Sequence, residues 1–177
     1  WLYQREAKKL LQYEKKIAQE FDASLFVSEA ESALFKTMAP ESKHKIGFLS
    51  NGVDTDYFSP LNDYLNPYLE NEVVLVFTGA MDYWPNIDAV HWFVDEVLPL
   101  VLKQVPKFEF WVIGDKPPTS LTSLTIPSLF VLGWVENLDE VLNKARLNIA
   151  PLRYGAGVKG KISHALSIGL PTVTTTI

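Results

Sequence analysis

Glycines and lysines gather in one short stretch near the end of the chain. Residues 155–161 read Gly-Ala-Gly-Val-Lys-Gly-Lys, after a strand-like apolar run and before a short helical pattern. Glycines allow backbone N–H groups to approach a ligand closely, and the N-terminus of the following helix carries partial positive charge. This combination is suited to an anion, most simply the diphosphate of a nucleotide. An ordinary surface loop with solvated lysines is the alternative interpretation.

The distribution of charge along the chain favours the anion site. The last acidic residue is Glu140, and the cations that follow it are Lys144, Arg146, Arg153, Lys159 and Lys161. The segment is not a Walker loop, because Lys161 is followed by Ile162 instead of Ser or Thr. It also lacks the Gly-x-Gly-x-x-Gly spacing of dinucleotide-binding turns.

The composition of the 177 residues excludes several classes of function. The net charge of −5 argues against nonspecific binding of nucleic acid. The absence of cysteine excludes a disulfide scaffold, a cysteine nucleophile and a thiolate metal site. No apolar run reaches the roughly 18 residues that a membrane span requires. The chain starts inside a helical pattern and stops just after a strand-like run, so we interpret it as a fragment of a longer protein.

The sequence of the first third of the chain indicates two helices and two strands, followed by a linker. Helical spacing or short apolar runs predict a helix and two strands, at 1–21, 23–27 and 45–49. Ser28 can cap a second helix, with Glu31 completing a capping box, and that helix should end before Pro40. Residues 55–71 are rich in Asp, Asn, Pro and Tyr and predict a linker between domains.

From Glu72 onward, strand and helix patterns alternate. The strand candidates are 73–77, 108–113, 129–132, 147–150 and 172–175. The helix candidates start at Asn86 or Asp88, at Leu138 and at Lys159. This alternation predicts an α/β fold, a Rossmann-like parallel sheet with helices on both faces. Ligands of such sheets bind outside the carboxyl ends of the strands. The turns that follow the strands should therefore line one edge of the sheet, and their glycines are Gly79, Gly114, Gly133, Gly155 and Gly157.

Several residues near these turns have two interpretations. His164 is either a polar residue on the surface of a helix or a hydrogen-bonding partner for a ligand. Trp134 either packs in the core or at its rim, or flanks a ligand base. The loop 81–86 caps a helix through Asn86, lines the ligand cleft, or does both. Asp54 and Asp56 follow Asn-Gly, and they predict a turn with solvated acids rather than a catalytic carboxylate pair.

Taken together, these motifs resemble a known family, the retaining, nucleotide-sugar-dependent glycosyltransferases of the GT-B fold, family 4. The resemblance covers nearly the whole chain. It includes Ser50-Asn-Gly-Val-Asp54 and Tyr57-Phe-Ser-Pro60, which are similar to the hinge signature of the family. Segments 76–83 and 85–89 resemble the opening of the donor domain in a bacterial subgroup linked to surface polysaccharides. Further segments fit other parts of the pattern, at 27–31, 112–114, 132–135 and 150–153.

The resemblance implies a role for individual residues. The backbone around Trp134 and Val135 would bracket the nucleotide base. Gly79 would let the phosphates or the sugar approach the first strand end of the donor domain. His164 falls where the family usually has a Glu that binds the ribose hydroxyls. The diphosphate would be held by Gly157, Val158, Lys159 and Lys161.

The sequence departs from the family pattern at four positions. Many relatives carry two Glu residues where this chain has Ala156 and His164, and a neutral imidazole cannot make the bidentate pair that a carboxylate makes with a diol. Relatives also often place Arg and Lys where this chain has Ala80 and Pro85. Lys159, Lys161 and Arg153 would therefore carry most of the positive charge that faces the phosphates.

We therefore expect a piece of a bacterial glycosyltransferase that is inactive on its own. Residues 1–54 would end the acceptor domain, 55–71 would be the linker, and 72–177 would be a truncated donor domain. The parent would transfer a sugar from a nucleotide diphosphate-sugar to a saccharide or lipid-linked acceptor in polysaccharide biosynthesis, with no nucleic-acid partner. Its catalytic residues stay unknown and are expected in the missing acceptor domain. A degenerate scaffold domain and a sugar-nucleotide epimerase are the alternatives.

The same resemblance sets expectations for cofactor, metal and location. We expect no cofactor beyond the donor substrate. We also expect no metal, because no carboxylate cluster offers a site for Mg²⁺. The parent would lie in the cytoplasm or at the inner face of the membrane, with any peripheral membrane contact made by the missing domain.

Overall fold

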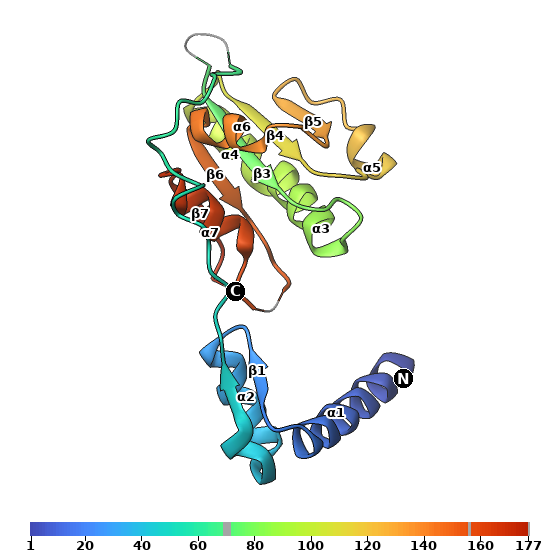
Figure 1. Cartoon of the computed structure of the whole chain (residues 1–177). Helices are drawn as coiled ribbons and strands as arrows, with labels where there is room; N and C mark the ends of the chain where they lie inside the picture. Colours follow the sequence, from blue (N-terminus) through green and yellow to red (C-terminus); the bar gives the residue numbers. More distant parts are fainter. Residues whose placement is uncertain (69–71, 156, 177) are drawn as a thin grey trace. The chain divides into compact units, whose positions relative to one another are not determined.

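The computed structural model describes residues 1–68, 72–155 and 157–176, and its contacts divide the chain into two compact units, Trp1–Gly52 and Val53–Ile177 (Figure 1). The first unit contains α1 (Leu2–Glu20), β1 (Ser24–Phe26), α2 (Glu29–Met38), the 3₁₀ helix η1 (Pro40–Lys45) and β2 (Ile46–Phe48). Its two strands pair in parallel. A small core of Ala18, Phe35, Ala39 and Ile46 holds this unit together.

The predicted cap of α2 is present. The Ser28 hydroxyl oxygen accepts a hydrogen bond from the Glu31 backbone N–H at 3.2 Å, which satisfies one of the unpaired amides at the helix start. The Glu31 carboxylate accepts in turn from the Ser28 hydroxyl at 3.0 Å. The helix ends at Met38, before Pro40 as predicted.

The second unit is built on a five-stranded sheet in which every pairing is parallel, with strand order β5-β4-β3-β6-β7. Its strands are β3 (Val74–Thr78), β4 (Glu109–Ile113), β5 (Leu129–Gly133), β6 (Leu147–Ala150) and β7 (Thr172–Thr174). Its helical elements are α3 (Trp84–Trp92), η2 (Phe93–Val97), α4 (Leu98–Gln104), α5 (Thr119–Thr122), α6 (Leu138–Lys144) and α7 (Gly160–Ser167). The predicted α/β fold is confirmed.

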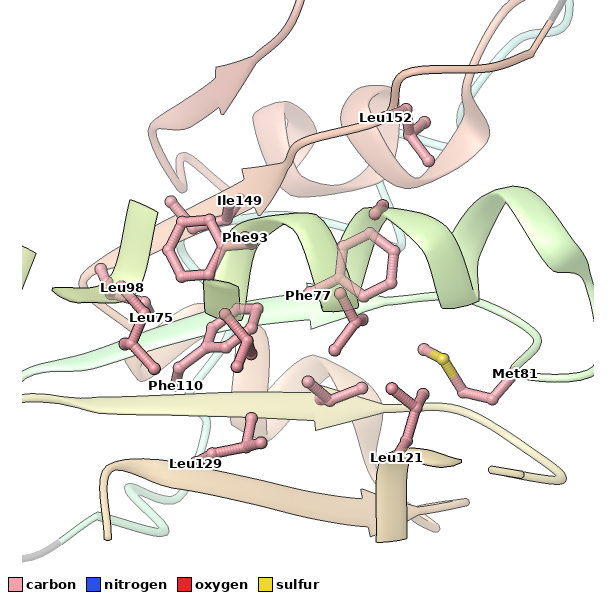
Figure 2. Close-up of a cluster of buried hydrophobic side chains, with 14 of the residues drawn as sticks. Leu75, Phe77, Met81, Phe93, Leu98, Phe110, Leu121, Leu129, Ile149 and Leu152 are labelled. Carbon is pink, nitrogen blue, oxygen red and sulfur yellow. The ribbon is translucent and has the colours of Figure 1, made fainter. Parts of the chain in front are cut away.

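The sheet has an apolar layer on each face, because successive side chains of a strand point to opposite sides. Leu75 and Phe77 of β3 belong to one buried cluster, together with residues of α3, η2 and α4. Figure 2 shows this cluster, in which the labelled side chains of helices and strands meet. Val74 and Val76 belong to a second cluster that includes residues of α6 and α7. The second unit is therefore a layered domain with helices on both faces.

The order of the strands places a ligand site. From β3 the chain moves outward to β4 and β5, then returns so that β6 pairs with β3 on its other side. Ligands of open parallel sheets bind where the strand order reverses in this way. The turns after β3 and β6 therefore lie beside the expected site.

Three local features differ from the predicted elements. Helix α3 begins at Trp84, before the predicted Asn86 or Asp88, because Pro85 occupies a first-turn position where no N–H is required. A π-helical turn, η2, precedes Pro99, which has no N–H to continue the regular helical bonding. The four-residue helix α5 was not predicted.

No helix in the described ranges is both long and apolar enough to cross a membrane.

Most of the predicted linker packs with the second unit. The Tyr68 hydroxyl donates to the Val141 carbonyl at 2.7 Å, and its ring meets Trp111 edge-on at 4.9 Å between centroids. Burial raises the pKa of the Tyr68 phenol well above its usual range. Asp54 accepts hydrogen bonds from the N–H groups of Asp56 and Tyr57, so this acidic pair forms the predicted turn.

Candidate functional site

Glycines lie at the carboxyl ends of β3, β4 and β5, and the one after β4 allows an unusually close backbone contact. The Gly79 N–H donates to the Ile113 carbonyl at 3.0 Å, and the Gly114 N–H donates to the Gly133 carbonyl at 2.8 Å. A Cβ atom on Gly114 would lie only 1.7 Å from the Gly79 carbonyl oxygen. Gly114 also has a φ of 153°, which L side chains rarely adopt. The edge of the sheet thus requires glycine at this position.

A hollow of about 490 Å³ opens at this edge, and we call it the first hollow. Its wall brings together six of the residues proposed from the sequence, Gly79, Gly114, Trp134, Val135, Lys161 and His164. Trp134 is 69% exposed, so it is not a core residue and its ring is available to a ligand at the rim. Gly133 supports this wall through the hydrogen bond to Gly114.

A smaller hollow of about 220 Å³ adjoins the first and is called the second hollow. Val158 and Lys159 line it, and Gly160 and Lys161 line both hollows. The two predicted lysines therefore share one cleft. Gly157 contributes through its carbonyl oxygen, which accepts a hydrogen bond from Lys159 Nζ at 3.0 Å. Ala156 lies outside the described residues.

The ammonium group of Lys161 occupies the boundary between the two hollows. Its Nζ donates to Asn86 Oδ1 at 2.8 Å and lies 4.2 Å from the centroid of the Phe77 ring. Burial, together with the charge of Lys159, lowers the pKa of Lys161 from its ordinary value of 10.5 to about 8. Among the described residues, no carboxylate forms an ion pair with this ammonium. Within the described ranges, this cation is desolvated and has no compensating anion.

Asn86 is a site residue whose contacts could not be deduced from the sequence. Its side chain is buried, donates to the Ala80 carbonyl at 2.9 Å and accepts from Lys161. It does not cap α3, which has Tyr83 at its N-cap position and no side-chain cap. Of the two roles predicted for Asn86, lining the cleft is the one observed.

The start of α7 adds backbone donors to the cleft. Gly160 and Lys161 are its first two residues, and their N–H groups cannot bond within the helix. In the described part of the chain, neither amide donates to a backbone carbonyl. These donors and the helix dipole both favour an anion at this position.

His164 lies on the wall of the first hollow and is held on two sides. Its Nε2 atom is 2.7 Å from Asp139 Oδ1 on α6, and both side chains are about one-fifth exposed, at 20% and 21%. The ring of Phe58 packs against the imidazole with 4.1 Å between centroids. The residue is therefore not simply a polar group on the helix surface. Neither Phe58 nor Asp139 was identified from the sequence as a neighbour of His164.

The structure does not bring Arg153 into the cleft. Its guanidinium donates to both carboxylate oxygens of Asp88, with Nε at 2.9 Å from Oδ2. The hydrogen bond to Asp88 is the main cause that raises the pKa of Arg153. Neither hollow includes Arg153 in its wall. Its charge is compensated inside the protein, in contrast to that of Lys161.

A third hollow, of about 450 Å³, lies on the face of the sheet covered by α3 and α4. Its wall is made almost entirely of apolar side chains, with Thr174 and Thr175 as the polar exceptions. It offers no charged group to a phosphate. Within the described ranges, no three residues of the metal-binding types gather where they could hold an ion.

Known structures share the fold of this chain. HepE from Anabaena, solved with UDP and glucose, is 14% identical with a TM-score of 0.66, and the match covers 93% of this chain and 47% of HepE. The pneumococcal O-GlcNAc transferase GtfA, solved with UDP and GlcNAc, is 15% identical with a TM-score of 0.71, over 93% of this chain and 32% of GtfA. A glycosyltransferase from Rickettsia africae is 16% identical with a TM-score of 0.65, and the match covers 92% of this chain and 48% of that protein.

These likenesses establish the fold, and the chain spans less than half the length of the three solved structures. No curated protein is significantly similar in sequence. The parallel sheet, with its glycine-rich edge at the point of strand reversal, defines the second unit as a Rossmann-like domain of the GT-B type. Residues 72–177 match the family described as Glycosyl transferases group 1, and the chain belongs to that family.

Proposed function

We propose that the second unit binds a nucleotide diphosphate-sugar as the donor domain of a glycosyltransferase. The diphosphate would lie against Lys161 and the first amides of α7, at the boundary of the two hollows. Lys159 would add charge from the second hollow. The observation that carries the proposal is the half-buried Lys161 ammonium, which contacts a neutral amide and an aromatic ring and forms an ion pair with no carboxylate in the described part of the chain.

The first hollow, with its volume of about 490 Å³, would hold the rest of the nucleotide. The exposed ring of Trp134 and the backbone of Val135 would bracket the base. His164 would hydrogen-bond to a ribose hydroxyl. Gly79, whose missing side chain lets the Asn86 amide and the Lys161 ammonium lie against the end of β3, would let the phosphates or the sugar approach the sheet there. Uridine diphosphate is the first nucleotide to test, because two of the structures with this fold contain it.

For the reaction itself, the role of these residues would be orientation and electrostatic stabilisation. The leaving diphosphate gains negative charge as the bond to the sugar breaks, and a fixed ammonium with helix amides stabilises that charge without reorganising. We infer that these donors make a metal ion unnecessary. Turnover by the full-length parent should therefore persist in excess chelator, and its loss would contradict this inference.

The longer protein would transfer the sugar to a saccharide or lipid-linked acceptor in polysaccharide biosynthesis, in the cytoplasm or at the inner face of the membrane. We propose that residues 1–54 are the end of its acceptor domain, 55–71 its linker and 72–177 its donor domain. Because the reaction of this fold takes place between two domains, the 177-residue chain should bind a nucleotide without turnover.

Calorimetric titration of the chain with uridine, adenosine, guanosine and cytidine diphosphates tests the donor site. At least one should bind, and Lys161→Gln should weaken it about tenfold or more, since a hydrogen bond to a charged group contributes roughly 1.5–3 kcal/mol. Lys144→Gln, at an exposed position on α6, is the matched control and should leave the affinity unchanged. Failure of every nucleotide to bind would favour a degenerate scaffold domain.

A further inference from the structure

The start of the second unit, ahead of its sheet, contributes an aromatic ring to the neighbourhood of the first hollow. The ring centroid of Phe58 lies 4.1 Å from that of His164, with 52° between the ring planes. Tyr57 also meets Phe58 edge-on, with 4.9 Å between ring centroids and 85° between the ring planes. Phe58, which belongs to neither the sheet nor its helices, therefore contacts His164 in the wall of the first hollow.

Local hydrogen bonds fix the position of Phe58. Its N–H donates to the Asp54 carbonyl at 2.9 Å, and Asp54 Oδ1 accepts from the Tyr57 N–H at 2.9 Å. Two residues later, Pro60 packs closely on Gly169, where a Cβ atom would lie 3.3 Å from the proline ring. The turn before Phe58 and the contact after it hold the aromatic ring in place.

Asp139 holds the same imidazole from α6. The 2.7 Å distance between His164 Nε2 and Asp139 Oδ1 assigns the Nε2 proton to this hydrogen bond. A neutral imidazole carries one N–H, so its Nδ1 atom keeps a lone pair and can only accept. The contact with Asp139 thus determines which chemical group His164 offers to a ligand, namely an acceptor for a hydroxyl.

We propose that Phe58 and Asp139 are positioning residues of the nucleotide site, and this rests on the function proposed above. Phe58 fixes the plane of the His164 ring, and Asp139 fixes its tautomer, so that Nδ1 accepts a hydrogen bond from a sugar hydroxyl of the nucleotide. The first residues of the second unit are then part of the ligand site.

The first test measures the affinity of the nucleoside diphosphate that binds the unchanged chain. Phe58→Ala should weaken binding about fivefold or more, the lower end of the coupling between linked sites, whereas Phe58→Tyr keeps the ring and should restore it. Asp139→Ala should also weaken binding, and Asp139→Asn, which retains the acceptor Oδ1, should restore most of it. Tyr68→Phe removes a hydrogen bond of the same segment away from His164 and is the control that should bind normally.

A double-mutant cycle separates positioning from a general loss of stability. In a His164→Ala background, Phe58→Ala should have no further effect on nucleotide affinity, although it should still lower the melting temperature. An equal loss of affinity in both backgrounds would overturn the proposal. Normal binding by Phe58→Ala would overturn it too, while leaving the nucleotide site itself intact. Absence of nucleotide binding by the unchanged chain would overturn both.

A second measurement needs no ligand. Nitrogen-15 NMR at a pH where the imidazole is neutral should show His164 protonated at Nε2, and Asp139→Ala should shift the population toward the other tautomer. Phe58→Tyr should preserve the ring-current shift of the His164 protons and Phe58→Leu should remove it. An unchanged tautomer in Asp139→Ala would contradict the role of Asp139 even if Phe58→Ala does not fold.

Discussion

Lys161 and Asn86 are 75 residues apart in the sequence, and their side chains meet at 2.8 Å between Nζ and Oδ1. Asn86 lies on the helix that follows β3, and Lys161 lies on the helix that follows β6. Because β3 and β6 are neighbours at the reversal of strand order, both helices start at the same edge of the sheet. The amide orients the ammonium without neutralising it, which leaves the positive charge for a ligand.

Replacement of Lys161 by Met should stabilise the fold while removing the site. A desolvated ammonium without an anion opposes folding, and a shift of one pKa unit corresponds to about 1.4 kcal/mol. We expect the free energy of unfolding at pH 7 to rise by about 1–2 kcal/mol in urea titrations. Nucleotide affinity should fall at the same time. Lys144→Met is the control, and a loss of stability in Lys161→Met alone would contradict this account.

The pKa of Lys161 predicts opposite trends of binding and stability with pH. The folded chain loses this proton at about pH 8, whereas the unfolded chain keeps it up to its ordinary pKa of 10.5. Below pH 8, burial of the charged ammonium lowers the free energy of unfolding by its full amount. Between pH 8 and 10.5 the folded chain buries a neutral amine instead, so the free energy of unfolding should rise. Nucleotide affinity should fall as pH rises above 8, because the ammonium is lost. The difference between the unchanged chain and Lys161→Met, measured at each pH, isolates both effects.

Gly79→Ala should impair binding more than folding. The added Cβ would lie 2.6 Å from Asn86 Nδ2 and 2.7 Å from Lys161 Nζ, which are ends of flexible side chains that can move. We expect a loss of stability of about 1 kcal/mol. The loss of affinity should be about tenfold or more, since displacing a positioned group by about 1 Å has large effects. Thermal melting and calorimetry on one sample compare the two, and full affinity would contradict the placement of the diphosphate.

Gly114→Ala should damage the fold itself. Here the added atom would lie 1.7 Å from the backbone oxygen of Gly79, which cannot move without disturbing β3. We expect a destabilisation of about 3 kcal/mol or more, the upper part of the range for overpacked sites. Gly160→Ala is the control, because nothing lies within 4 Å of its added Cβ. A similar melting temperature for both variants would show that the close backbone contact is not present in solution.

Arg153→Gln should leave nucleotide affinity unchanged. Both carboxylate oxygens of Asp88 already bind the guanidinium, and Arg153 belongs to the wall of neither hollow. The variant should melt at a slightly lower temperature, as should Asp88→Asn, because each removes one side of the same pair. Calorimetry that finds weaker nucleotide binding in Arg153→Gln would assign this arginine to the phosphates after all.

The strands and most helices of the second unit could be predicted because their signals are local. An apolar run such as 73–77 needs only its own residues to indicate a buried strand, and β6 was predicted with its observed bounds, Leu147–Ala150. The helix α5 was missed because four residues are too few to show a helical period. The glycines and lysines of residues 155–161 could likewise be recognised as a candidate anion site from the local sequence alone.

The contacts that decide the chemistry of the site are not local. His164 and Asp139 are 25 residues apart, and Arg153 and Asp88 are 65 apart. Lys159, Lys161 and Arg153 all lie in the same acid-free stretch of sequence. In the structure, Asp88 neutralises Arg153, whereas no carboxylate of the described residues pairs with Lys161. That distinction depends on which helix lies beside which strand end, and the order of the strands cannot be deduced from hydrophobic periodicity.

Tyr68 has a consequence for how the protein is divided into parts. The family match begins at residue 72, whereas the phenol that bonds to Val141 and covers Trp111 lies upstream of that point. A shortened protein starting at Glu72 would expose an indole edge and leave a carbonyl without its donor. The region that matches the family and the region that forms one compact unit therefore have different boundaries, and excision for biophysical work should begin no later than Val53.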